Sequence, residues 1–258
     1  MRISFIGAGR VAHHLARALK ERHQIVQICS RKYEHAAALA QAVGAEAATS
    51  FSALKAEIDL LIIAVSDSAI ADVIQSVHRY APEVLIAHTS GSTDIAKLTA
   101  VHPRAGVLYP LQTFSFEREI DWAQTPVFIE AAELQDSAIL NALANELSQR
   151  VYEYTSAQRL SLHLAAVYAC NFANYCYDMA KQVVDAQQVD FSLLYPLILE
   201  TAQKATAADP KAMQTGPAMR GDKNIIAMHA EMLEQSQRQD LKAVYALLSE
   251  QILKRHHS

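Results

Sequence analysis

The sequence predicts an α/β fold, in which an N-terminal doubly wound sheet of the Rossmann type is followed by an all-helical C-terminal domain. Three observations carry this prediction. A glycine turn, Gly7–Ala12, directly follows a short apolar run near the start of the chain. Apolar runs of strand length then alternate with helical patterns over residues 1–155. After Ser156 the helical spacing continues, and no segment has the pattern of a strand.

The elements of the first domain, residues 1–155, follow one another in βαβ order. Apolar runs predict strands at residues 3–6, 24–30, 46–48, 58–65, 84–88, 106–109, 127–129 and 151–154. Helical spacing is found at 13–19, 33–43 and 134–147, and a cap at Ser66-Asp67-Ser68 predicts a helix reaching about Tyr80. Gly44 stands where a left-handed glycine commonly ends a helix. The run at 58–65 is largely apolar, as in a central parallel strand covered on both faces.

The second domain, residues 156–258, is predicted to consist of helices joined by short turns. Helical patterns cover residues 157–185, 192–207 and 224–254, and Asp222 is placed to cap the last of them. The closing segment, Arg255–Ser258, is too short for a metal site and is interpreted as a frayed end.

Composition limits the classes of function. The 258 residues are 51% hydrophobic and 19% charged, which is typical of a globular protein. The net charge of −4 gives no general attraction to nucleic acid. No apolar stretch reaches the ~20 residues of a membrane helix. Three cysteines without a C-x-x-C pair favour reduced thiols, so we expect a cytoplasmic protein without a membrane partner. Neither a metal-binding His/Cys spacing nor a hydrolase G-x-S-x-G motif is found.

The turn Gly7-Ala8-Gly9-Arg10-Val11-Ala12 has the G-x-G-x-x-A form that joins strand to helix in dinucleotide-binding proteins. The first glycine permits the tight turn, the second lets a pyrophosphate approach the backbone, and the alanine lets the helix pack closely on the strand. Free N–H groups at the start of the helix attract phosphate. We therefore expect Gly7 to Val11 to bind a dinucleotide.

The end of the next predicted strand indicates which dinucleotide is bound. NAD sites usually carry a carboxylate about 20 residues after the glycines, where it accepts a hydrogen bond from the ribose 2′-hydroxyl. This chain has Ser30, Arg31 and Lys32 there, and its first carboxylate is Glu34. A hydroxyl and a guanidinium suit the 2′-phosphate of NADP, which is the expected cofactor. The alternative is that Arg31 and Lys32 only form the solvated start of a helix.

Other candidate residues are expected at the same edge of the sheet, because open α/β sheets bind ligands at the carboxyl ends of their strands. Val65 and Ser66 could border the cofactor, with helix capping as the alternative for the serine. Ser90 is a candidate catalytic residue, whereas His88 before it is more typical of a histidine held by backbone carbonyl groups. Gln112 could bind a substrate carbonyl or amide, or could lie in an ordinary loop between domains.

A polar stripe is predicted on the first helix of the second domain. At 100° per residue, five side chains fall within an arc of roughly 80°: His163, Val167, Asn171, Asn174 and Asp178. Their neighbours are largely apolar, so the helix is predicted to be largely buried. Because buried polar groups need partners, the stripe is either a packing network or the wall of a site.

The wall of a site is the favoured interpretation of this stripe, because the stripe begins at the predicted domain junction. His163 and Asn171 are then candidate catalytic residues, and Asn174 is a candidate substrate-binding residue. A histidine there could donate a proton to a carbonyl oxygen or an imine nitrogen. Arg220, between two glycines before the last predicted helix, could hold a substrate carboxylate or phosphate. The alternative is a turn whose arginine pairs with a nearby carboxylate.

Five segments carry a resemblance to a known superfamily: Gly7–Ala12, Ser30-Arg31, Tyr109–Phe114, His163–Asn174 and Thr215–Asp222. The chain resembles the 6-phosphogluconate-dehydrogenase-like reductases, which include pyrroline-5-carboxylate reductase and the deazaflavin-dependent NADP reductases. The resemblance spans essentially the whole chain and implies an NADP-binding oxidoreductase that forms a homodimer through its helical domain. The β-hydroxyacid dehydrogenases of that group use a lysine where this chain has asparagines, so their lysine-assisted oxidation does not carry over.

The leading hypothesis is an NADP(H)-dependent oxidoreductase that acts on a small carbonyl or imine substrate between the nicotinamide and the helical domain. The alternative is a non-catalytic NADP-binding sensor or scaffold, which the sparse set of acid–base groups allows. A third hypothesis is hydride exchange between NADP and a deazaflavin, which needs a wide apolar cleft. Turnover of any NADPH-coupled substrate would favour an enzyme over a sensor.

Overall fold

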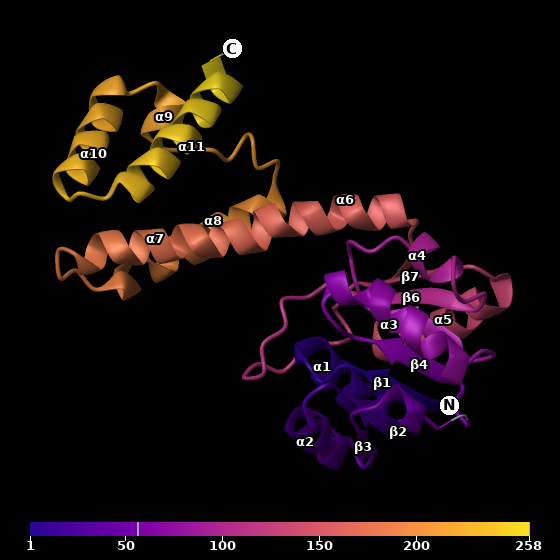
Figure 1. Cartoon of the computed structure of the whole chain (residues 1–258). Coiled ribbons are helices and arrows are strands. Elements are labelled where there is room, and N and C mark those ends of the chain that lie inside the picture. Colours follow the sequence, from indigo (N-terminus) through magenta and orange to yellow (C-terminus); the bar gives the residue numbers. More distant parts are fainter. Residues whose placement is uncertain (56, 258) are drawn as a thin grey trace. The chain divides into compact units, whose positions relative to one another are not determined.

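The computed structural model describes residues 1–55 and 57–257. The chain divides into two compact units, Met1–Cys170 and Asn171–Ser258. The first unit holds the β-sheet, and the described part of the second is built from helices and connecting turns (Figure 1). The predicted α/β fold class is confirmed, including the change from strands to helices near Ser156.

One eight-stranded sheet forms the centre of the first unit. Its strands are β1 (Arg2–Ile6), β2 (Gln24–Cys29), β3 (Glu46–Ala48), β4 (Leu60–Ile63), β5 (Leu85–His88), β6 (Ala105–Pro110), β7 (Val127–Ala131) and β8 (Val151–Glu153). The strand order is β3-β2-β1-β4-β5-β6-β7-β8. All eight predicted strands are present, and their ends differ from the prediction by no more than two residues.

The direction of β7 was not indicated by the sequence. β7 pairs antiparallel with β6, whereas every other neighbouring pair in the described sheet is parallel. A parallel return needs a crossover connection, usually a helix. The chain from 111 to 126 contains no helix, so β7 comes back beside β6 in the opposite direction. The helix α5 (Leu134–Leu147) then provides the crossover that makes β8 parallel to β7.

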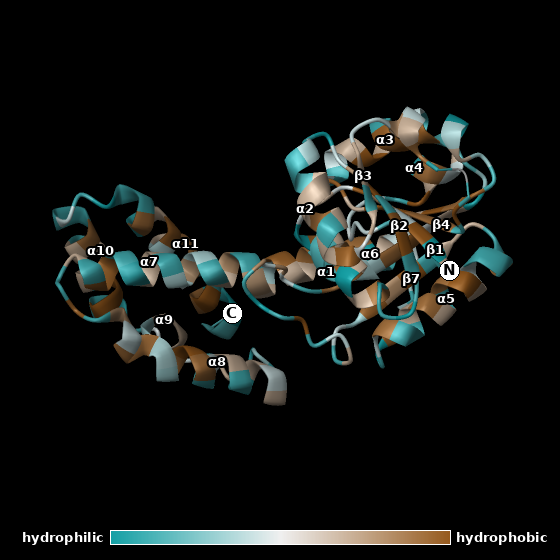
Figure 2. Ribbon diagram, turned by 90° about the horizontal axis from the view of Figure 1, so that it is seen from below, coloured by the Kyte–Doolittle hydropathy of each residue, from teal (hydrophilic) through white to brown (hydrophobic). Residues whose placement is uncertain are grey.

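Helices cover both faces of the sheet. One apolar cluster joins it to α1 (Arg10–Leu19), α2 (Tyr33–Val43) and α5, and another joins it to α3 (Ile70–Val77) and α4 (Ala96–Thr99). Leu60 and Ile62 of β4 belong to the first cluster, and Leu61 and Ile63 belong to the second. All four side chains are fully buried. Burial of each one stabilises the folded state by about 1.5–3 kcal/mol relative to leaving it exposed. Figure 2 shows the hydrophobic colour concentrated on these central strands.

Helix ends in the first unit agree with the prediction at one position and differ at another. Gly44 ends α2 in the left-handed conformation, with φ of 72°, as predicted. The single helix predicted up to Tyr80 is instead three pieces, because the 3₁₀ turns η2 (Asp67–Ala69) and η3 (His78–Tyr80) flank α3. A further 3₁₀ turn, η1 (Phe51–Ala53), precedes β4.

The helices from Ser156 onward are α6 (Ser156–Ala166), the π-helix η4 (Val167–Phe172), α7 (Ala173–Asp185), the 3₁₀ turn η5 (Phe191–Leu194), α8 (Tyr195–Ala207), α9 (Pro217–Arg220), α10 (Lys223–Gln235) and α11 (Gln239–His257). Asp222 caps α10 by accepting a 3.2 Å hydrogen bond from the backbone of Ile225, as predicted. The prediction of one helix over 224–254 is wrong, because the chain turns at Gln237, whose φ is 55°.

The C-terminal segment is not frayed, so that prediction is also wrong for its described residues. α11 extends to His257, and the Nε2 atom of this histidine lies 2.7 Å from the carbonyl oxygen of Met219. Ser258, the last residue of the segment, lies outside the described residues.

The predicted burial of the helix at 157–185 is wrong for the single chain. Three large apolar side chains on α6 and η4 are half exposed or more: Leu164 is 57% exposed, Tyr168 is 65% exposed and Phe172 is 50% exposed. An apolar pattern indicates that a face is suited to burial, but it does not say which molecule covers it. Within this chain the described residues leave these side chains in contact with solvent.

Candidate cofactor and active site

A pocket of about 1070 Å³ opens at the carboxyl ends of the central strands. All nine residues predicted to bind a cofactor line it: Gly7, Ala8, Gly9, Arg10, Val11, Ser30, Arg31, Val65 and Ser66. Thr89, from the loop after β5, and Gln112, from the loop after β6, line it as well. The volume is just above the ~300–1,000 Å³ range of small-molecule sites. The fold therefore brings the predicted residues together in one cavity large enough for a dinucleotide.

Two glycines of the turn after β1 have different physical roles. Gly7 has φ of 111°, and a Cβ atom there would lie 2.1 Å from the carbonyl oxygen of Ala64. Gly9 has no atom within 4 Å of the position of a Cβ, so the space beyond it is open. Because α1 begins at the next residue, the free N–H groups of its first turn are presented to this space. These residues fit the phosphates of a dinucleotide.

The end of β2 supplies polar groups at another part of the pocket. Arg31 is exposed, and its guanidinium makes no ion pair within residues 1–55 and 57–257. His35 of α2 and Thr49 after β3 line the same pocket and were missed from the sequence. His35 lies in the first turn of α2, directly after the end of β2, and that position in the sequence could have indicated it. The hydroxyl of Ser66 makes no capping bond to η2, so the capping alternative is not what this side chain does.

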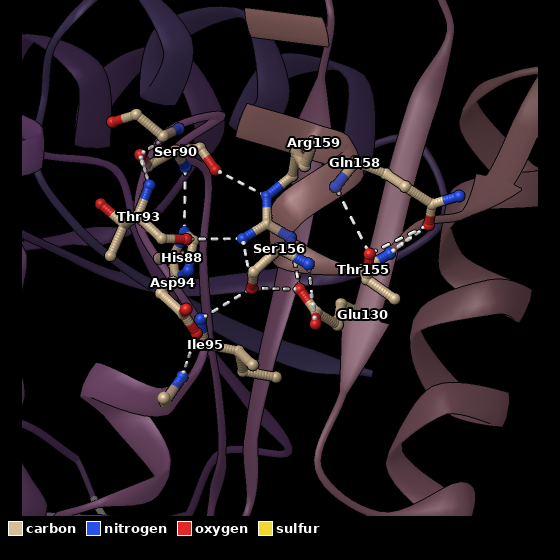
Figure 3. Close-up of polar contacts among 12 residues, drawn as sticks. His88, Ser90, Thr93, Asp94, Ile95, Glu130, Thr155, Ser156, Gln158 and Arg159 are labelled. Atoms are coloured by element: carbon tan, nitrogen blue, oxygen red, sulfur yellow. Dashed lines mark hydrogen bonds and ion pairs between the residues drawn. The ribbon is translucent and has the colours of Figure 1, made fainter. Parts of the chain in front are cut away.

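A buried arginine fixes the loop that follows β5 (Figure 3). Arg159 of α6 is fully buried. Its Nε atom donates to the carbonyl oxygen of Ser90 at 3.2 Å, and its Nη2 atom donates to that of Thr93 at 2.5 Å. Its Nη1 atom pairs with the carboxylate of Glu130 on β7. The arginine therefore joins the β5 loop, the sheet and α6 into one rigid piece.

The same network includes Ser156, the first residue of α6. Its hydroxyl donates to Glu130 at 2.7 Å, and its backbone N–H donates to the other oxygen of that carboxylate at 3.0 Å. The backbone of Ile95 in turn donates to the Ser156 hydroxyl at 3.0 Å. A buried charge is stable only when its partners are complete, and here both oxygens of Glu130 are occupied.

His88 ends β5 and is completely buried. Its Nδ1 atom accepts a 3.0 Å hydrogen bond from the backbone N–H of Ser90, so it is held by an amide rather than by the carbonyl groups that were predicted. Burial lowers the pKa of this imidazole to about 3, and the nearby charge of Arg159 adds to the shift. His88 is therefore neutral at physiological pH and supports the loop.

Two side chains converge on Gly91 in this loop. A Cβ atom on Gly91 would lie 2.8 Å from the Oη atom of Tyr109 and 3.0 Å from the Nδ1 atom of His163. Neither side chain has a hydrogen-bond partner among the residues that the structure describes. His163 follows Arg159 by one helical turn, so the network that fixes the loop also fixes the helix that carries the histidine. The arrangement offers two polar groups to a ligand.

Tyr109 begins the segment Tyr109–Phe114 that carries the resemblance, but it was not chosen as a candidate site residue from the sequence. Burial raises the pKa of its hydroxyl to about 12, and the negative charge of Asp67 adds to that shift. Asp67, in turn, accepts a hydrogen bond from the hydroxyl of Ser92. Tyr109 therefore keeps its proton at physiological pH and can donate it in a hydrogen bond.

The other predicted site residues lie in different settings. The hydroxyl of Ser90 accepts hydrogen bonds from the backbone of Ser92 at 3.1 Å and of Thr93 at 3.0 Å, which makes it a support of the loop. Gln112 lines the cofactor pocket rather than the space around Gly91. The predicted site residues in the second unit are exposed: Asn171, Asn174 and Arg220.

The π-helix η4 changes the predicted polar stripe. The calculation of a common face assumed 100° per residue throughout, but residues 167–172 wind as a π-helix. A π turn contains about one residue more than an α turn, which rotates the following helix by about 100°. The spacing of 100° per residue therefore does not hold across residues 167–172, and a common face for all five side chains does not follow from it.

The described residues form neither a metal site nor a membrane-spanning helix. Among the described residues, no group of three or more His, Cys, Asp or Glu side chains is placed to hold a metal ion. None of the described helices is both long enough and apolar enough to cross a membrane.

Comparisons with known proteins identify the family of this chain. Residues 2–91 match a family model described as NADP oxidoreductase, coenzyme F420-dependent, and residues 125–252 match a domain of unknown function, DUF2520. Over 98% of both chains, the sequence is 42% identical to a Bacteroides fragilis protein provisionally described as an NADP oxidoreductase, with a TM-score of 0.92. This chain belongs to that family of NADP oxidoreductases. A search among curated proteins finds no match.

More distant structures share the fold of this NADP oxidoreductase. An imine reductase from Myxococcus stipitatus in complex with NADP⁺ is 16% identical, with all of both chains covered and a TM-score of 0.72. A pyrroline-5-carboxylate reductase from Streptococcus pyogenes is 14% identical over 99% of this chain and 98% of its own, with a TM-score of 0.63. The resemblance predicted from the sequence is confirmed, and so is NADP as the cofactor of the family.

Proposed function

We propose that this oxidoreductase uses NADP(H) to act on a small carbonyl or imine substrate at the edge of the sheet where β5 and β6 end. One observation carries the proposal. The pocket that joins the glycine turn to Ser30 and Arg31 also reaches Thr89, and two residues farther along that loop Tyr109 and His163 converge on Gly91. A dinucleotide held by its phosphates at one end would have its nicotinamide directed toward the loop.

The chain's own groups suit proton transfer at this place. The bound nicotinamide supplies or accepts the reducing equivalent. The Oη atom of Tyr109 and the imidazole of His163 can each hold a proton near the oxygen or nitrogen of a substrate over Gly91. Arg159 and Glu130 position these groups without touching the substrate. Ser90 supports the same loop, because its backbone N–H and carbonyl bond to His88 and Arg159 and its hydroxyl accepts from Ser92 and Thr93.

The proposal also includes roles for four other residues predicted from the sequence. Asn171 is assigned a catalytic role, and Asn174, Gln112 and Arg220 are assigned roles in substrate binding. The exposure of Arg220 on the short helix α9 is compatible with a guanidinium that meets a carboxylate or phosphate.

Oxidation of NADPH in the presence of small aldehydes, ketones and cyclic imines tests the reaction. We expect turnover with a member of this panel, and we expect His163→Ala and Tyr109→Phe to lower kcat while the Kd for NADPH changes less than about twofold. Tight binding of NADPH without turnover across the panel would favour the sensor or scaffold. Reduction of a deazaflavin alone would favour exchange between two coenzymes, which the family match of residues 2–91 makes worth including.

A homodimer through the helical part is also proposed, in a cytoplasmic protein whose three cysteines are free. Exposed apolar side chains recur on its helices, and they include Leu164, Tyr168 and Leu197. Exposed apolar surface commonly marks a protein interface. Sedimentation velocity should show a dimer that Leu164→Asp dissociates, whereas Leu134→Asp, on α5, which packs against the sheet, should not. A monomeric native protein would remove this part of the proposal.

A further inference from the structure

The segment after β6 lies against the start of α1. The Nε2 atom of His14 donates a hydrogen bond to the carbonyl oxygen of Ser115 at 2.7 Å. The ring of His14 also lies 5.6 Å from that of Phe114, and the ring of His13 meets Phe116 edge-on at 5.3 Å. We call residues Gln112–Phe116 the strap. Two consecutive histidines of α1 thus hold a segment that is about a hundred residues away in sequence.

The strap forms a wall of the cofactor pocket. Gln112, Phe114 and Phe116 line the pocket together with Gly9 and Arg10. His13 and His14 are three and four residues beyond Arg10, the first residue of α1, so the contacts that hold the strap lie one turn from the start of the helix. The strap therefore lies beside the N–H groups that are suited to bind phosphate.

A hydrogen bond and several ring contacts hold the strap in a defined position against α1. His14 is 9% exposed, so its contacts with the strap are largely shielded from solvent. Burial lowers the pKa of His13, and the charges of His14 and Arg17 add to that shift, so the ring that meets Phe116 is neutral. Phe114 also approaches Trp122, with ring centroids 6.2 Å apart. In contrast, Phe116 is 52% exposed, so one side of its ring is available to a ligand.

We propose that the strap is a cofactor-binding element, in which Phe116 and Phe114 cover the pyrophosphate of NADP(H) at the start of α1 and His14 holds the segment in place. The inference rests on the proposed use of NADP(H). A cover of this kind excludes water from the phosphates, which strengthens their attraction to the helix N-terminus because the local dielectric constant is lower. Phe116 is the residue that meets the cofactor, and His14 is a positioning residue.

The dissociation rate of NADPH, followed by its fluorescence in stopped flow, tests the strap directly. We expect Phe116→Ala and His14→Ala each to raise this rate about five- to tenfold, as for the loss of one aromatic contact. His14→Gln should restore a rate within about twofold of the native protein, because its amide can donate to the Ser115 carbonyl. Leu134→Ala, which removes an exposed apolar side chain outside the pocket, should leave the rate unchanged.

Fragments of the cofactor locate the contact. Calorimetry with 2′-phospho-ADP-ribose, which keeps the pyrophosphate but lacks nicotinamide, should show the same loss of affinity in Phe116→Ala as NADPH shows. Adenosine 2′-monophosphate, which carries no 5′-phosphate, should bind the native protein and the variant equally. Hydrogen exchange at the amides of residues 112–116 should slow when NADPH binds, which gives a readout that does not depend on turnover.

Each outcome decides between the possibilities. An equal loss of affinity for adenosine 2′-monophosphate would contradict contact with the pyrophosphate. If the native protein binds NADPH and Phe116→Ala releases it at the native rate, the inference about the strap is wrong while the proposed function survives. If the native protein binds no NADPH, both fail. Because Phe116 is half exposed, its substitution decides the matter even if His14→Ala does not fold.

Discussion

Gly91→Ala is expected to destabilise the first unit because the new methyl group would crowd the side chains of Tyr109 and His163. The added Cβ atom would lie 2.6 Å from Cζ and 2.8 Å from Oη of Tyr109, and 3.0 Å from Nδ1 of His163. Cβ atoms essentially never approach other heavy atoms to less than 3.0 Å, so the tyrosine ring must move. Extra atoms in a well-packed site cost about 1–3 kcal/mol, which we expect as the loss in free energy of unfolding.

Urea denaturation of four proteins measures this effect: the native chain, Gly91→Ala, Tyr109→Ala and the double variant. Removing the tyrosine ring creates space for the new methyl group, so the double variant should be more stable than the sum of the single effects predicts. The expected coupling is about 0.5–3 kcal/mol, the range for residues in direct contact. Strictly additive effects, or a Gly91→Ala protein as stable as the native chain, would refute the proposed crowding at this glycine.

Three further predictions concern the same sheet edge. Arg159→Met should lower the free energy of unfolding by about 3–5 kcal/mol in chemical denaturation, because Glu130 loses its buried partner; a change below about 1 kcal/mol would contradict this. Gly9→Ala should weaken NADPH binding at least about tenfold in calorimetry while thermal stability stays level or rises, since only the cofactor competes for that space. The low pKa of His88, about 3, means that the unfolded chain binds a proton that the folded chain does not. Stability should therefore fall by about 2 kcal/mol from pH 6.5 to pH 5, and His88→Asn should remove that part of the slope.

The strands and the cofactor turn could be predicted because their signals are local. Each strand is a compact apolar run, and Gly7–Ala12 encodes both the turn and the start of α1 in six neighbouring residues. The order of βα units then determines that Ser30, Val65 and Ser66 reach the same edge of the sheet as the glycines. For this reason all nine predicted cofactor residues are found around one pocket.

The residues around Gly91 could not be assembled in the same way. Tyr109 and His163 meet there only because β6 lies beside β5 and because Arg159 fixes α6 to the loop. These contacts join residues that are far apart in sequence, and a helical wheel cannot show them. The wheel also failed across η4, since one π turn changes the phase of every residue that follows it.

Burial of the long helix was overestimated for a related physical reason. A pattern of apolar residues indicates that a face is suited to burial. The pattern is the same whether this chain or another molecule buries that face. The exposed Leu164 and Tyr168 therefore look like core residues in the sequence. The measurement of assembly state described above separates the two cases.

The dissociation constants of NADPH and NADH, measured by calorimetry for the native protein and for Arg31→Ala, test the central claim most directly. The native protein should bind NADPH at least about tenfold more tightly than NADH, because the guanidinium makes charge-assisted hydrogen bonds to the 2′-phosphate. Arg31→Ala should remove most of that difference and leave the affinity for NADH nearly unchanged. Equal affinity of the native protein for the two nucleotides, or no binding of either, would contradict the account.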